Sequence, residues 1–238
     1  MNGLDLVVTI FPVLMMGAWV TLKITSISVA IGCVLGLFAG LGRLSKKRLV
    51  KGLATAYVDF FRGTPLYVQI LLVYFGLPQI VNDTQSWLVA TYDLPQAFKS
   101  FRLDIWTAAI LVCSLNSGAY IAEIFRAGVQ SIERGQMEAA RSLGMSHFQA
   151  MSYVILPQAF KRVIPPLGNE FIAMLKDTAI LAAIGFEELA RRGQLINAEY
   201  YQPFPIYLTV AFMYLAMTLT LSRLVDWLER RLKTDDRG

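Results

Sequence analysis

The sequence predicts an all-α integral membrane protein in which one transmembrane domain, residues 1–238, crosses the bilayer five times. Hydrophobic residues make up 55% of the chain and charged residues only 16%, whereas soluble domains hold about 25% charged residues. Apolar runs of bilayer length recur, and basic residues cluster beside alternate runs. These observations favour a membrane protein over a soluble one. The same observations favour a membrane protein over a nucleic-acid-binding protein, despite the net charge of +5.

Five segments meet the length requirement for a membrane span. A bilayer core of about 30 Å needs about 20 mostly apolar helical residues, and the predicted spans are about 16–41, 65–81, 104–125, 166–185 and 204–227. Polar residues interrupt the second and fourth of them. Gly32, Gly36 and Gly40 recur every four residues in the first span, which predicts close packing against another helix.

The flanking charges predict the orientation. Basic residues follow the first span (43–51), occur throughout the connection between the third and fourth (126–162), and follow the fifth (230–233). By contrast, Lys99 and Arg102 are the only basic residues in the connection 82–103. Because basic connections face the cytoplasm, we expect the N-terminus outside and the C-terminus inside. Arg191 and Arg192 are exceptions on the expected outer side, where acidic residues accompany them.

The connection between the third and fourth spans is too long for a simple turn. Residues 131–157 are predicted to form short amphipathic helices, with Ser131 as the first cap and Gly144 as the first helix end. Ser146 and Gln149 have capping-box spacing for a second helix, which Pro157 should end. From physical chemistry alone, this pair could enter a groove of another protein or lie on lipid.

A specific pattern in this connection distinguishes the two alternatives. Glu138, Ala139 and Ala140 are followed by Gly144 and then, after Val154, by Leu156 and Pro157. This arrangement resembles the EAA loop of permeases of ATP-binding-cassette (ABC) importers, with Val154 in place of an isoleucine-like residue. The resemblance implies a cytoplasmic coupling helix in a cleft of an ATP-hydrolysing subunit. On that reading, small Ala139 and Ala140 permit close approach and Gly144 permits the turn.

The resemblance covers about residues 10–232. The stretches 62–65, 116–123, 165–169 and 176–178 are similar to the polar amino acid branch of the family, above all to its glutamine-type permeases. The resemblance implies the type I ABC importer permease fold. It also implies passage of a polar amino acid, which is glutamine, glutamate or a basic amino acid. The implied location is the bacterial cytoplasmic (inner) membrane, with several passes.

The resemblance also implies partners. They are two ABC ATPase subunits, a second permease copy that is identical or similar, an extracytoplasmic amino-acid-binding protein and membrane lipid, without nucleic acid. ATP and Mg would be held by the ATPase subunits and no cofactor by this chain, which lacks a Gly-rich phosphate loop ending in Lys-Ser/Thr. We therefore expect a non-catalytic subunit.

Polar residues within the predicted spans are candidates for a substrate pathway, since a charge at a helix centre costs about 2.5 to 3.5 kcal/mol. Asn116, Tyr120 and Glu123 share a helical face by their spacing, and Ser117 lies beside them. A second group, Lys176, Asp177 and Thr178, interrupts the fourth span. Donors and acceptors of both signs suit an amino acid's ammonium and carboxylate. An inter-subunit polar network is the alternative.

A further polar motif, Arg62 and Thr64, lies where the second span begins. We expect Arg62 to cap a helix or to pair with Asp59 or with a neighbouring subunit.

Two other classes of function are weighed against the permease. A secondary transporter commonly shows internal repeats and more spans. A membrane enzyme could use Glu123, Lys176 and Asp177 as an acid–base set. Metal and nucleophilic schemes have little support, because His147 is the only histidine and Cys33 and Cys113 lie in apolar runs.

Overall fold

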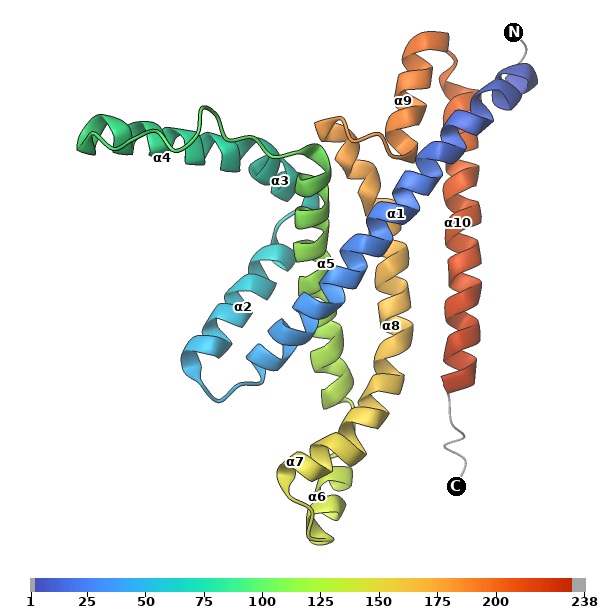
Figure 1. Ribbon diagram of the computed structural model, residues 1–238. Helices are drawn as coiled ribbons and strands as arrows, with labels where there is room; N and C mark the ends of the chain where they lie inside the picture. Colours follow the sequence, from blue (N-terminus) through green and yellow to red (C-terminus); the bar gives the residue numbers. More distant parts are fainter. Residues whose placement is uncertain (1–2, 233–238) are drawn as a thin grey trace.

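The computed structural model describes residues 3–232, so Lys233 and the rest of the chain's last residues lie outside it. Within that range every regular element is helical. Four long helices, α1 (Gly3–Arg43), α5 (Ile105–Gln130), α8 (Leu156–Asp177) and α10 (Pro203–Leu232), form the body, and α1 crosses the other three at an angle (Figure 1). The remaining helices are α2 (Arg48–Gly63), α3 (Leu66–Leu71), α4 (Leu77–Tyr92), α6 (Arg134–Ser142), α7 (His147–Ala150) and α9 (Leu189–Tyr200), with π-helical turns η1 (Leu72–Gly76) and η2 (Met151–Ile155) and the 3₁₀ helix η3 (Thr178–Ile184).

The most extensive helix contact among the described residues joins α1 to α5. A Cβ atom added at Gly36 would lie 2.8 Å from the carbonyl oxygen of Gly118 and 2.7 Å from a methyl group of Ile121. Only a residue without a side chain fits that space. Gly32 and Gly40 face α5 on either side of this point, so the glycine face expected from the sequence does pack against another helix.

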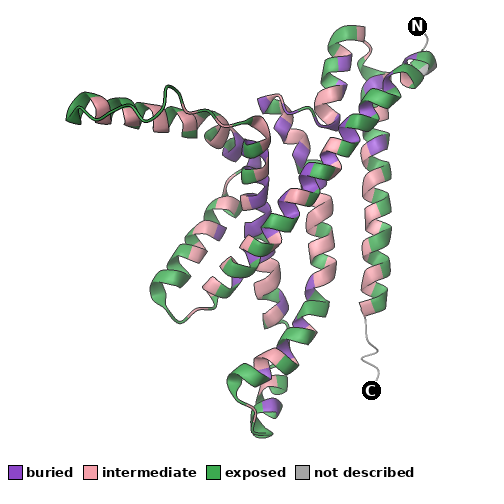
Figure 2. Cartoon of the chain, in the orientation of Figure 1, coloured by how far each residue is buried: buried purple, intermediate pink, exposed green. Residues whose placement is uncertain are grey.

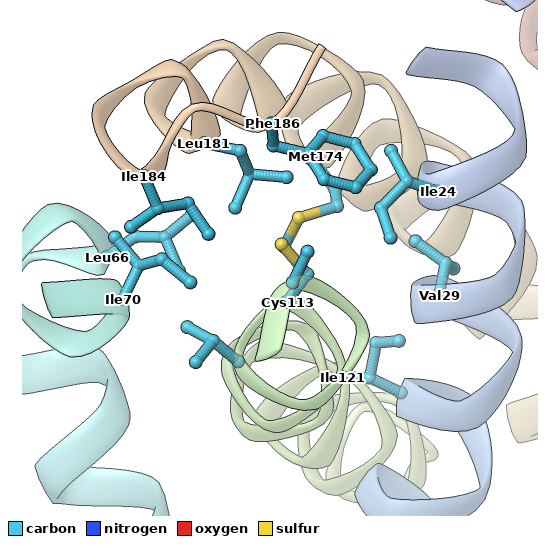
Figure 3. Close-up of a cluster of buried hydrophobic side chains, with 12 residues drawn as sticks. Ile24, Val29, Leu66, Ile70, Cys113, Ile121, Met174, Leu181, Ile184 and Phe186 are labelled. Atoms are coloured by element: carbon cyan, nitrogen blue, oxygen red, sulfur yellow. The ribbon is translucent and has the colours of Figure 1, made fainter. Parts of the chain in front are cut away.

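An apolar core surrounds α5. Ile24 and Val29 of α1, Leu66 and Ile70 of α3, and residues of α8 and η3 meet around Cys113 and Ile121 (Figure 3). Burial is concentrated along α1 and α5, whereas α4 is without a buried residue (Figure 2). The two cysteines are free. The body is therefore organised around α5, and α4 extends away from it (Figure 1).

A buried carboxylate ties three helices together near the middle of α1. Glu188 is fully buried and caps α9 by accepting hydrogen bonds from the backbone N–H groups of Ala190 (3.0 Å) and Arg191 (2.7 Å). It also accepts from the hydroxyls of Tyr214 of α10 (2.6 Å) and Thr21 of α1 (3.4 Å). Burial raises the pKa of the Glu188 carboxyl, and these hydrogen bonds oppose that rise. We call this arrangement the Glu188 clamp.

The helices match the predicted spans to different degrees. In the described residues, α1 from Asp5, α5 and α10 are each long and apolar enough to cross a membrane. The pair formed by α2 and residues 66–92 would be a fourth span if counted as one, with a bend of 106° near Pro65. The predicted span 65–81 therefore becomes part of a broken helix, because Pro65 lacks the N–H that a continuous helix needs. The five-span count stays a prediction.

The segment 166–185 is divided between two kinds of helix. The α-helix ends at Asp177, and the chain continues as η3 until Gly185, whose φ is +84°. The hydroxyl of Thr178 donates to the carbonyl of Leu175 at 2.8 Å, which helps to end α8 there. Pro165 and Pro166 lie inside α8.

Replacing Gly36 by alanine tests the α1–α5 contact. We expect the free energy of unfolding to fall by about 1–3 kcal/mol, because the new methyl group would overlap the backbone of α5. Thermal unfolding in one detergent measures the effect. Gly52→Ala is the matched control, since nothing lies within 4 Å of a Cβ there. Equal stabilities of the two variants would contradict the account of this contact.

Candidate functional site

The segment 131–157, which we call the α6–α7 loop, is a compact protrusion at the end of α5 and α8 (Figure 1). Gly144 has φ +83° and ends α6: its N–H donates to Arg141, and the next N–H, of Met145, donates to the carbonyl of Ala140 at 3.2 Å. These bonds form a Schellman motif, which requires the left-handed conformation that glycine adopts without strain. The prediction that Gly144 ends this helix is confirmed.

The second helix of the loop also begins as expected. The Ser146 hydroxyl accepts from the N–H of Gln149 at 3.2 Å, and the Gln149 side chain accepts from the N–H of Ser146 at 2.8 Å. This reciprocal capping box fixes the start of α7.

Two expectations for the loop are wrong. Ser131 does not cap α6: it ends α5, and its hydroxyl donates to the carbonyl of Gly128 at 2.7 Å. Pro157 does not end the second helix, because the chain runs helically from His147 to Asp177. The π-helical turn η2 directly precedes Leu156 and Pro157 and widens the helix where the proline lacks its N–H.

A small core fixes the loop to the body. Ile132, Ile155 and Ala159 are buried together, and Met137 packs against them. Ala140, from the predicted coupling motif, is also buried in the loop, whereas Glu138, Ala139, Gly144, Leu156 and Pro157 are exposed. Because its core contains residues that adjoin both α5 and α8, the loop is packed against the ends of these two helices.

The outer surface of the loop carries large apolar side chains. Leu143 is 82% exposed and Phe148 79% exposed, and Tyr153 is also exposed. Side chains of this kind are unfavourable in contact with water, so their grouping on one short protrusion indicates a contact surface. Neither Phe148 nor Tyr153 was predicted from the sequence. For Phe148 the available signal was an aromatic residue in the short polar helix α7.

In the body, the predicted polar residues divide among three surroundings. Asn116 is 5% exposed and donates to the side chain of Gln69 at 3.0 Å. Gln69 in turn donates to the carbonyls of Phe61 (2.8 Å) and Thr64 (2.9 Å), and to the Thr64 hydroxyl. These carbonyls lie at the α2–α3 break and have no partner further along α2. Asn116 and Thr64 therefore belong to an amide network that braces the broken helix.

Ser117 faces the opposite way, toward α8. Its hydroxyl donates to Glu170 at 2.9 Å. Of the second predicted group, Thr178 is fully buried, whereas Lys176 and Asp177 are exposed at the end of α8. The structure thus brings Ser117 to Glu170, which was not among the predicted site residues, and leaves Lys176 and Asp177 on the surface of the chain.

Glu123 is the centre of an ion-pair group near the α6 end of α5. Its carboxylate accepts from Arg43 of α1 at 2.8 Å and from the Nε atom of Arg126 at 3.0 Å, and Arg62 of α2 lies 3.9 Å away. Asp59 lies 3.9 Å from Arg43. We call these residues the Glu123 hub. It links α1, α2 and α5 through partly buried charges, with 20% exposure for the Arg43 side chain and 23% for Glu123.

The expected partner of Arg62 within the chain, Asp59, is therefore replaced by Glu123 and Tyr120. The guanidinium carbon of Arg62 lies 5.4 Å from the centre of the Tyr120 ring, a cation–π contact. Asn116, Tyr120 and Glu123 do share one face of α5, and it is directed at the last turn of α2. Residues 3–232 hold no group of three or more His, Cys, Asp or Glu side chains that could bind a metal ion.

Comparison with known proteins places this architecture in a family. Residues 32–234 match the family model described as "Binding-protein-dependent transport system inner membrane component". The chain is 41% identical over 222 residues to the glutamine transport system permease protein GlnP of Escherichia coli (strain K12), covering 93% of this chain and 94% of that protein. It is 36% identical over 236 residues to the arginine transport system permease protein ArtQ of Bacillus subtilis (strain 168), covering 98% and 100%.

Solved structures agree with this assignment. The crystal structure of an amino acid ABC transporter with histidines contains a chain that is 42% identical, with a TM-score of 0.86, covering 97% of this chain and 99% of that one. An inward-facing structure of the MetNI methionine ABC transporter has a TM-score of 0.72 at 19% identity and shows the same fold. The chain therefore belongs to the family of inner membrane components of binding-protein-dependent transport systems.

Proposed function

We propose that this chain is the permease subunit of an ATP-driven importer that carries glutamine, glutamate or a basic amino acid across the bacterial cytoplasmic membrane by alternating access. One observation carries the proposal: an exposed apolar protrusion, built on the ends of α5 and α8, in a chain of this family. The names of its relatives, glutamine and arginine permeases, support the substrate class. No structural observation favours the secondary transporter or the enzyme.

In this proposal the α6–α7 loop enters a cleft of the ATPase subunit. Exposed Glu138, Ala139 and Gly144 would lie at the contact, with Leu143 and Phe148 as apolar anchors. Ala140, Leu156 and Pro157 would act by shaping the loop, since Ala140 is buried and the other two follow η2. Force from the ATPase would then reach α5 and α8 through the small core.

The substrate pathway is proposed along the polar face of α5 and the end of α8. Direct contact is proposed for the exposed side chains of Tyr120, Lys176 and Asp177. The other predicted residues of α5 and α8 would position them, because the structure gives each a protein partner: Asn116, Ser117, Glu123 and Thr178, together with Thr64 at the α2–α3 break. Arg62 lies over the Tyr120 ring at the same end of the pathway.

The proposed complex holds two permease copies, identical or similar, and two ATPase subunits that bind ATP and Mg. An extracytoplasmic binding protein would deliver the amino acid. Five spans, with the N-terminus outside, would place the α6–α7 loop in the cytoplasm, which agrees with the basic residues around it. The exposed apolar length of α4 would be covered by lipid or by the second permease.

Uptake by proteoliposomes tests the function. This chain, its ATPase and its binding protein are purified together and reconstituted, and labelled glutamine, glutamate, histidine and arginine are offered outside. We expect uptake of at least one of them only when ATP and the binding protein are both present. Uptake that persists without the ATPase would support an ion-driven transporter instead.

Substitution in the α6–α7 loop tests the coupling surface. Leu143→Asp and Phe148→Asp should leave the permease folded, because both side chains are exposed, but weaken the ATPase complex by about 2 kcal/mol or more each. Co-purification of the ATPase and ATP-driven uptake measure the loss. Leu49→Asp is the control, since Leu49 is 75% exposed but lies on α2. Wild-type docking by both loop variants would refute this assignment.

The variant Glu123→Gln distinguishes a structural role of Glu123 from a role in chemistry or in substrate contact. We expect the free energy of unfolding to fall by about 1–3 kcal/mol, since Arg43 and Arg126 lose a charged acceptor while partly buried. Asp59→Asn should change it by at most about 0.5 kcal/mol, because Asp59 is 65% exposed. ATPase docking should survive in both variants. Unchanged stability together with lost transport would show instead that Glu123 acts on the substrate.

A further inference from the structure

A cavity of about 450 Å³ opens beside the Glu123 hub, between the last turn of α2 and the helices α5 and α8. This volume is within the range of small-molecule sites. Most of its wall is apolar, from residues such as Ile124 and Ala127, and its polar side chains include Arg62, Arg162 and Tyr120. The cavity lies directly next to the α6–α7 loop, because Ser131 also lines it.

The positive charges around this cavity are less fully paired than the negative charge of Glu123. The Glu123 carboxylate is already engaged by Arg43 and Arg126, so it leaves Arg62 only a loose ion pair at 3.9 Å. Arg162 donates to the backbone carbonyl of Ser131 at 2.5 Å, and no carboxylate lies within ion-pair distance of it among residues 3–232. Each guanidinium has five N–H donors, so both groups have donors to spare.

We propose that Arg62 and Arg162 bind the α-carboxylate of the transported amino acid in this cavity, as its last site before release. The inference rests on the proposed function for the identity of the ligand. A guanidinium matches a carboxylate with two parallel hydrogen bonds. The Tyr120 ring beneath Arg62 holds that guanidinium in place.

The position of Arg162 connects this site to the α6–α7 loop. Ser131 caps the C-terminal end of α5 where the loop begins, and its carbonyl accepts a hydrogen bond from Arg162. Arg162 can bind a carboxylate through its remaining donors while it still donates to this carbonyl. Occupancy of the exit site is thereby linked to the junction through which the ATPase would act.

A phospholipid phosphate offers the same oxyanion chemistry, and the test distinguishes the two sources. The assembled permease–ATPase complex is placed in nanodiscs of phosphatidylcholine alone. Binding of glutamine, glutamate, histidine and arginine is measured calorimetrically without the binding protein, alongside their decarboxylated amines. The variants are Arg62→Gln, Arg162→Gln and Arg162→Lys, with Arg48→Gln as the control because Arg48 is exposed at the start of α2.

We expect the transported amino acid to bind, and each glutamine variant to weaken it about tenfold or more through loss of a charge-assisted contact. Arg162→Lys should be intermediate and Arg48→Gln unchanged. The amine should bind weakly and equally to wild type and variants, because it lacks the group that the arginines recognise.

Three results would overturn the proposal. Equal loss of amino acid and amine would mean that the variants disturb packing. Displacement of the amino acid by phosphatidylglycerol in the wild type would assign the cavity to lipid phosphate. Absence of binding by all four amino acids would leave no exit site. Failure of the proposed function is a separate result, because ATP-driven uptake by the wild-type complex would then be missing.

Discussion

The arrangement of the helices depends on how closely α1 approaches α5. At Gly36 the two backbones are so near that a methyl group would overlap the Gly118 carbonyl. This contact sets the position of α1 relative to the apolar core around α5, and two polar groups then join α1 to other helices. The Glu188 clamp joins the middle of α1 to α9 and α10, and the Glu123 hub joins its C-terminal end to α2 and α5.

The two polar groups have different physical properties, which suits a protein that must change shape. Glu188 is fully buried and its carboxylate accepts four hydrogen bonds from three elements, so separating them would leave a buried charge unpaired. The hub is partly exposed, and Arg62 is held there only loosely. Ion pairs in contact with water can break and re-form at small cost. Movement driven through the α6–α7 loop would therefore open the hub before the clamp.

Local sequence signals predicted local structure well. The glycine face of α1, the end of α6 at Gly144 and the capping box of α7 each depend on residues within a few positions, and the structure agrees. The prediction that Pro157 ends a helix was wrong, because it considered the proline without the turn before it. A proline ends a helix unless that turn widens, and η2 is such a turn. Partners distant in sequence could not be predicted. Glu170 with Ser117, Gln69 with Asn116 and Arg62 with Glu123 depend on how the helices pack, which no spacing in a single span records.

In the proposed mechanism this chain transmits force between a binding protein on one side of the membrane and an ATPase on the other. The decisive measurement is the rate of ATP hydrolysis by the reconstituted complex, with the empty or the amino-acid-loaded binding protein added on the opposite side from ATP. We expect the loaded protein to raise this rate clearly, and Leu143→Asp to abolish the rise. A hydrolysis rate that does not respond to the binding protein would refute the mechanism.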